Sequence, residues 1–126
     1  KLYPKGQISW KGFVETNKLQ EGLGQCRALL NTPKWNEAYG NVIVEAMACG
    51  VPVVAYRKGG PSEIIKHGET GFLVTPDDKE GLVLYLKKIN MINRKRCREW
   101  VENNASSRIF ANKVVRWLKQ VMKGYD

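Results

Sequence analysis

Residues 51–57, VPVVAYR, constrain the fold more than any other segment of the sequence. Apolar and largely β-branched residues follow one another there without alternating with polar ones, which predicts a strand covered on both faces. Strands of this kind are typical of parallel sheets with helices on both sides. Residues 41–49, NVIVEAMAC, come just before and predict a helix, capped at its start by Asn41 and ended by Gly50 and Pro52. Together the two segments predict an α/β layer fold.

The other segments continue this alternation of strands and helices. Further strands are predicted at residues 8–14 (ISWKGFV), 28–33 (ALLNTP, buried) and 71–74 (GFLV). Helices are predicted at 15–27, where two glycines weaken the pattern, as a single turn within 59–70, and at 77–92, 93–104 and 106–125. Five apolar residues of the last helix share one stripe and are predicted to pack: Phe110, Val114, Trp117, Leu118 and Val121. The fold class is therefore α/β, a parallel sheet with flanking helices.

Composition supports a single domain and limits the classes of ligand that the chain could bind. The chain has 126 residues and 43% hydrophobic content, enough to bury a core. Its net charge is +9, and many of the cations lie in the last third. A basic surface can serve nucleic acid, an anionic membrane leaflet or a phosphorylated small molecule. The alternative is a set of solvated helix faces.

The chemical inventory argues against several classes of protein. Three widely spaced cysteines, no CxxC pair and a single histidine, His67, predict no metal site. His67 falls in a polar turn and is interpreted as a surface residue. Residues 22–27, GLGQCR, lack the third glycine of a dinucleotide fingerprint, and the sequence has no P-loop and no nucleophile elbow. Reduced thiols and the absence of an apolar run of membrane-spanning length predict a cytoplasmic protein.

Two glutamates flank the start of the helix predicted at 41–49. Ligands of open parallel sheets bind where strands end and loops lead into helices, and residues 33–40, PKWNEAYG, form such a loop. The helix start offers N–H groups and partial positive charge to a phosphate, and Gly40 lets the backbone approach it. Glu45 would then meet ribose hydroxyls, and Glu37 the group beyond the phosphates. The alternatives are that Glu45 faces solvent or pairs with a lysine, and that Glu37 is an exposed loop acid.

The stretch E-A-Y-G-N-V-I-V-E-A-M-A-C-G-V-P-V-V-A-Y, followed by G-G-P-S-E-I-I and G-E-T-G-F-L-V, resembles a known domain. It is similar to the C-terminal domain of retaining GT-B glycosyltransferases, in the group 1 (family 4) set that includes sucrose-, mannosyl- and lipopolysaccharide-glucosyl-transferases. The shared signature is a pair of glutamates separated by seven residues, here Glu37 and Glu45. The resemblance extends over residues 8–120 and is dense from 36 to 76.

This resemblance implies roles for the matching positions. Glu37 would be the catalytic residue, contacting the transferred sugar and stabilising charge at its anomeric carbon, and Glu45 would bind the ribose. Main-chain groups would make the other donor contacts: Ala38, Tyr39 and Gly40 with the sugar, Asn41 and Val42 with the diphosphate, and Gly12, Phe13 and Val14 with the base. The G-G-x-x-E element at 59–63 is interpreted as mainly structural.

The resemblance also implies what the chain lacks. In this family an upstream arginine and lysine clamp the diphosphate, and nothing in residues 1–126 matches them. Since the sequence also begins with Lys1, we expect an N-terminally truncated C-terminal nucleotide-sugar-binding domain, without the upstream part of that domain and without the N-terminal acceptor domain. The expected donor is a nucleoside diphosphate sugar, UDP-sugar first, transferred with retention of configuration, without a metal or other cofactor, to an unidentified sugar, lipid-linked sugar or small molecule.

Alternative interpretations use the chain as a binding module. One is a non-catalytic nucleotide-binding domain, and the other is a basic module in which NRKRCREW binds nucleic acid or a membrane. Alternating basic and aromatic residues can stack on single strands. However, Trp100 shares a helical face with Cys97, which predicts burial, so no nucleic-acid partner is expected. Contact with the cytoplasmic face of a membrane would suit a lipid-linked acceptor.

Overall fold

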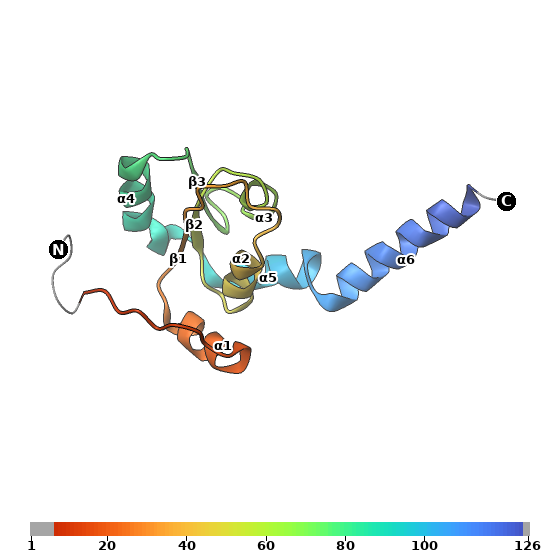
Figure 1. Cartoon of the computed structure of the whole chain (residues 1–126), viewed down its shortest axis with the longest axis horizontal. Helices are drawn as coiled ribbons and strands as arrows, with labels where there is room; N and C mark the ends of the chain where they lie inside the picture. The colour runs from red at the N-terminus through yellow and green to blue at the C-terminus, as the bar shows by residue number, and fades with distance from the viewer. Residues whose placement is uncertain (1–6, 125–126) are drawn as a thin grey trace.

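The computed structural model describes residues 7–124 and has a three-stranded parallel sheet at its centre (Figure 1). The strands, in spatial order, are β1 (Leu29–Asn31), β2 (Val53–Tyr56) and β3 (Gly71–Val74). Val53 of β2 pairs with Leu29 on one side and with Gly71 on the other. The α/β class predicted from the sequence, a parallel sheet with flanking helices, is confirmed.

Helices cover both sides of this sheet. One side carries α2 (Asn41–Ala48) and α5 (Arg94–Asn104), and the other carries α4 (Lys79–Lys87), as Figure 1 shows. The remaining elements are α1 (Thr16–Gln25), α3 (Pro61–Ile64), the 3-10 helix η1 (Ile89–Met91) and α6 (Ser107–Lys123). Within residues 7–124, no helix is both long and apolar enough to cross a membrane.

The core is built around β2. All four residues of this strand are buried, and Val53, Val54 and Ala55 have no exposed surface. Ile43 and Met47 of α2 are buried in the same core. The absence of polar alternation in the sequence therefore reflects a central strand with packing on both faces.

The strand predicted at residues 8–14 is wrong. This segment has no strand structure, and Trp10 and Phe13 are each 93% exposed. A strand needs a neighbour to accept its backbone hydrogen bonds, and none of the three strands in the described chain runs beside it. β1 was predicted to be buried, but Leu30 is 48% exposed because β1 lies at the edge of the sheet.

The predicted cap of α2 is also wrong. Asn41 is already the first helical residue, and the capping position belongs to Gly40, with φ +89°. This left-handed conformation is strained for residues with a Cβ, so glycine suits the position. The predicted end is confirmed, because the helix stops at Ala48, just before Gly50. For α4, the predicted acidic start is confirmed: the Asp78 carboxylate accepts a hydrogen bond from the Gly81 N–H at 2.9 Å.

The apolar stripe of α6 does not pack against the core, contrary to prediction. α6 extends away from the rest of the molecule (Figure 1), and Phe110 and Trp117 are 67% and 60% exposed. The stripe is real, but no element within residues 7–124 covers it. Residue 125, at the end of the predicted helix, lies outside the described part of the chain.

The immediate surroundings of His67 and Cys97 determine the hydrogen bonding of one and the pKa of the other. His67 is exposed as predicted, yet its Nδ1 accepts a hydrogen bond from the Leu73 N–H at 3.0 Å, which ties the turn to β3. Cys97 is buried, and burial raises the pKa of its thiol to about 11. The three cysteines are free thiols, and within the described residues no cluster of ligands could hold a metal ion.

Candidate functional site

The loop that carries Glu37 is held by the loop that follows β2. The Gly60 N–H donates a hydrogen bond of 2.7 Å to the Glu37 carbonyl, and Glu37 also forms an isolated parallel bridge with Gly59. The two backbones lie so close that a Cβ on Gly60 would overlap the Tyr39 carbonyl. The G-G-x-x-E element therefore positions the Glu37 loop, which agrees with its structural interpretation.

The start of α2 lies directly after this loop. Gly40 turns the chain into the helix, so Asn41 and Val42 occupy its first turn, and both are exposed. The N–H groups of the first helical residues have no intrahelical acceptor, and the helix dipole places partial positive charge there. No acidic residue lies in this first turn to neutralise that charge. We refer to the exposed N–H groups of Asn41 and Val42 as the amide cradle.

Neither glutamate is engaged inside the protein. Glu37 is half-buried and Glu45 is exposed. Among residues 7–124, neither carboxylate forms an ion pair or a hydrogen bond with another residue. Of the two alternatives for Glu45, the pairing with a lysine is therefore absent from the described chain, and the exposure of Glu45 to solvent is what the structure shows. Both carboxylates are free to bind a ligand.

Glu45 lines a cavity of about 200 Å³ between three helices. The cavity opens between α1, α2 and α5, and its lining includes Thr16, Leu19, Ala48 and Arg98. Its lining includes two charged side chains of opposite sign, Glu45 and Arg98. A hydroxyl-rich group such as a ribose could find both donors and acceptors there.

A second cavity, of about 620 Å³, lies in front of the start of α2. Tyr39, Asn41 and Val44 line one side of it, and Asn104, Ser107, Phe110 and Lys113 line the other. The structure thus brings Tyr39 and Asn41 together but gives Glu45 to the neighbouring cavity. Lys113, whose Nζ donates a hydrogen bond of 3.3 Å to the Asn104 carbonyl, adds a cation to the lining of this cavity. It was missed in the sequence because only the fold brings residues 41 and 113 to one cavity.

The three residues predicted to bind the base lie elsewhere. Gly12, Phe13 and Val14 line neither of these two cavities, and the strand whose end was expected to place them is absent. Their role stays a prediction without support from their position. Glu37 also lines neither of the two cavities, and its role likewise stays a prediction.

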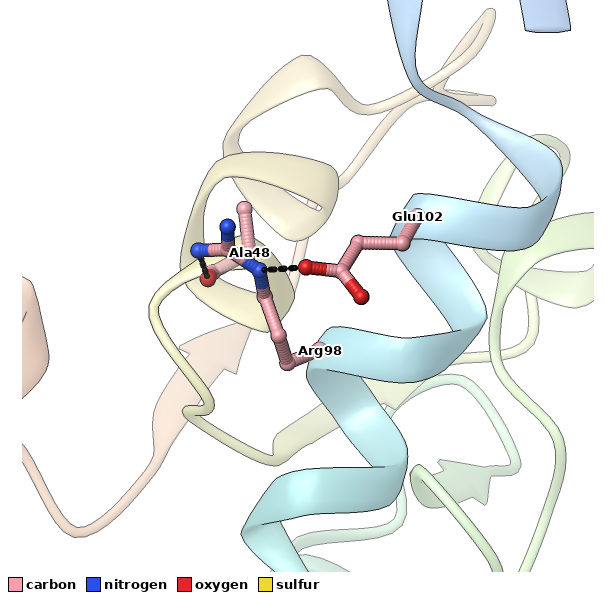
Figure 2. Close-up of polar contacts among 3 residues, drawn as sticks. All are labelled: Ala48, Arg98 and Glu102. Carbon is pink, nitrogen blue, oxygen red and sulfur yellow. Dashed lines mark hydrogen bonds and ion pairs between the residues drawn. The ribbon is translucent and has the colours of Figure 1, made fainter.

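Arg98 fixes the far end of α2 (Figure 2). Its Nη1 donates a hydrogen bond of 2.7 Å to the Ala48 carbonyl at the last residue of α2, and its Nε contacts Glu102 Oε1 at 2.7 Å. One turn earlier on α5, Arg94 donates in the same way to the carbonyls of Gly24 and Cys26, at 2.9 and 2.8 Å. Two cations of the NRKRCREW segment are therefore used to hold helix ends, which the sequence did not indicate.

Replacing Arg98 by alanine is expected to lower the free energy of unfolding by about 1 kcal/mol. The guanidinium satisfies a carbonyl that α2 cannot pair internally, but its partial exposure limits the loss. Urea unfolding measures the change. Arg96→Ala is the matched control on the same helix, since Arg96 is exposed and its side chain forms no hydrogen bond or ion pair in the described chain. An equal loss in both variants would contradict the role of Arg98.

A short parallel sheet, with an amide cradle at a strand's carboxyl end and the Glu37 loop leading into it, defines an α/β domain suited to a phosphorylated ligand. The chain belongs to the glycosyl transferases group 1 family, whose model matches residues 1–107. The fold is that of a GT-B glycosyltransferase domain, as the resemblance implied.

Curated relatives and solved structures agree with this family. The chain is 35% identical over 101 residues to sucrose synthase of Acidithiobacillus caldus, covering 77% of this chain and 13% of that protein. It is 40% identical over 76 residues to sucrose synthase 3 of Arabidopsis thaliana, covering 56% of this chain and 9% of that protein. The chain thus spans about a tenth of the length of these relatives.

Two solved structures align over most of the chain. Anabaena HepE in complex with UDP has a TM-score of 0.73 at 26% identity, covering 79% of this chain and 29% of that one. Sucrose-phosphate synthase from Thermosynechococcus elongatus has a TM-score of 0.83 at 24% identity, covering 95% of this chain and 31% of that one, and supports the fold alone.

Proposed function

We propose that the protein binds a nucleoside diphosphate sugar and, as part of a complete enzyme, transfers the sugar to an acceptor with retention of configuration. The observation that carries this proposal is the amide cradle, with Glu37 in the loop just before it and Glu45 one turn further along α2, neither carboxylate being in an ion pair within residues 7–124. Support also comes from the family and from the Anabaena HepE structures, which contain UDP or UDP-glucose. UDP is accordingly the first donor nucleotide to test.

The diphosphate would lie against the amide cradle. N–H groups and the helix dipole favour an anion there, and their stabilisation increases as the leaving diphosphate gains charge. Lys113 would add a cation from the other side of the cavity. In this proposal catalysis is electrostatic and needs no metal, with the remaining positive charge supplied by the upstream part of the domain.

The two carboxylates would bind different parts of the donor. Glu45 would accept hydrogen bonds from the ribose hydroxyls in the cavity that it shares with Arg98. Glu37, in the loop before the cradle, would lie beside the sugar, with the N–H groups of Ala38, Tyr39 and Gly40 near its hydroxyls. A negative charge there stabilises the positive charge that develops at the anomeric carbon.

Glu45→Ala is expected to weaken UDP binding about tenfold, because a charged hydrogen-bond acceptor for the ribose is lost. Calorimetric titration with UDP, UDP-glucose, GDP and ADP measures the effect and identifies the nucleotide. Glu69→Ala is the matched control, since Glu69 is an exposed acid that precedes β3 and lies at the opposite end of the sheet. Equal affinities of the wild type and Glu45→Ala for every nucleotide that binds would overturn the ribose assignment.

A further inference from the structure

Lys58 attaches the Glu37 loop, residues 32–40, to the loop after β2 at a second point. Its Nζ donates a hydrogen bond of 2.9 Å to the Lys34 carbonyl. The first point of attachment is the bond from the Gly60 N–H to the Glu37 carbonyl. One bond holds the start of the Glu37 loop and the other holds its middle, and both donors belong to the same short segment after β2.

The backbone of Lys58 is fixed to the sheet, so its side chain extends from a rigid base. The Arg57 N–H donates a hydrogen bond to the Val74 carbonyl of β3 at 2.8 Å, and the Lys58 N–H donates one to the Tyr56 carbonyl at 2.8 Å. Tyr56 and Val74 are buried and face each other in paired strands. Lys58 itself is half-buried, whereas the neighbouring Arg57 is exposed. The hydrogen bond from Lys58 therefore holds the Lys34 carbonyl at a fixed position relative to β2 and β3.

Lys58 contacts the backbone of the Glu37 loop and not the Glu37 carboxylate. Within residues 7–124 the Lys58 ammonium forms no ion pair. It therefore does not neutralise the negative charge that the proposed function places on Glu37. A cationic donor also bonds a carbonyl more strongly than a neutral donor does. Because the acceptor is a main-chain carbonyl, the contact depends on the side chain of residue 58 and not on that of residue 34.

We infer that Lys58 is a positioning residue for Glu37, an inference that rests on the proposed function of Glu37. A charged group accelerates a reaction only when it is held in the productive geometry, and a displacement of about 1 Å can cost about 100-fold in rate. With the Gly60 bond alone, the loop can tilt about that bond and change the direction of the Glu37 carboxylate. The bond from Lys58 opposes this tilt. It thereby raises the fraction of molecules in which the carboxylate lies beside the transferred sugar.

Amide hydrogen exchange of this chain, followed by NMR at Gly60, tests the attachment without any ligand. Lys58→Met keeps a long side chain but removes the donor, and it should raise the exchange rate of the Gly60 N–H about fivefold, because the loops then separate more often. Lys58→Arg keeps a cationic donor and should leave the rate within about twofold of the wild type. Lys34→Met is the matched control, since it removes an exposed cation from the same place but leaves the carbonyl, and its rate should also stay within about twofold.

Steady-state kinetics connect this attachment with catalysis, in an enzyme that contains this chain together with the upstream domains of its relatives. Lys58→Met should lower kcat about tenfold and leave the KM for the donor within about threefold, because the loop is misplaced while the amide cradle and Glu45 stay intact. Lys58→Arg should restore most of kcat, since arginine can donate to the same carbonyl.

The outcomes separate this inference from the proposed function. Unchanged exchange at Gly60 or unchanged kcat in Lys58→Met would overturn the positioning role alone. So would a rise in the donor KM with kcat unchanged, because Lys58 would then bind the donor through its charge. A wild-type enzyme that neither binds a nucleotide nor transfers a sugar would overturn the proposed function, and with it the catalytic role of the attachment.

Discussion

Gly60→Ala is expected to lower the free energy of unfolding by about 3 kcal/mol and to abolish donor binding. The new methyl group would overlap the Tyr39 carbonyl, and relief requires the two loops to separate. Separation would break the hydrogen bond of 2.7 Å from the Gly60 N–H to the Glu37 carbonyl and would move the residues just ahead of the amide cradle. Urea unfolding measures the first effect, and UDP calorimetry measures the second.

The cause of this effect is steric rather than conformational. Gly60 has φ −47° and ψ −41°, a right-handed helical conformation that alanine adopts without strain. Gly22→Ala is therefore an informative control: Gly22 lies inside α1, and a Cβ there meets no atom within 4 Å. The free energy of unfolding of that variant should rise by about 0.5–1 kcal/mol, because alanine has a better helix propensity than glycine. Wild-type stability of Gly60→Ala would show that this contact does not hold the loop.

Local signals in the sequence predicted the elements that depend on local causes. β2 was recognised because burial on both faces excludes polar residues from it. The start of α4 was recognised because Asp78 bonds a backbone N–H three residues away. The start of α4 depends on a contact between residues close in the sequence, and β2 depends on burial along the whole strand. Both causes leave a recognisable pattern of residue types in the sequence.

The failures concern partners that are distant in the sequence. ISWKGFV has the composition of a strand, but strand structure needs a neighbour that residues 7–124 do not supply. The stripe on α6 was correctly identified as apolar, yet periodicity cannot say what covers it. The cap of α2 failed for another reason: Asn41 and Gly40 both suit helix starts, and only the backbone angles decide between them.

In the candidate site too, the residues with a local sequence signal were predicted and those brought together only by the fold were missed. Glu37 and Glu45 were singled out by spacing and by the family pattern, and the structure leaves both carboxylates unpaired in the described chain. Arg98 and Lys113 were not, because α5 and α6 reach α2 only through the fold. The sequence therefore identified groups suited to touch a ligand, and it missed groups that hold or complete their surroundings.

Glu37→Gln, tested in an enzyme that contains this chain together with the upstream domains of its relatives, is expected to lower kcat about 100- to 1000-fold. Glutamine keeps the size and the acceptor oxygen of the side chain but removes the negative charge. Donor affinity should stay within about threefold of the wild type, because that charge stabilises the transition state more than the neutral sugar. Steady-state kinetics with the donor varied, together with calorimetry, separate the two quantities.

The geometry of the loop allows this substitution to remove the charge without disturbing the backbone. Glu37 anchors its loop through its backbone carbonyl, not through its carboxylate, so the change from Glu to Gln leaves the hydrogen bond with Gly60 in place. The melting temperature should therefore match the wild type, and a loss of turnover cannot be attributed to a displaced loop. Glu45→Gln provides the contrast, with weaker donor binding and a smaller effect on kcat. If both variants lost binding and turnover to the same extent, the two carboxylates would act on the same part of the donor, and the assignment of one to the sugar and the other to the ribose would fail.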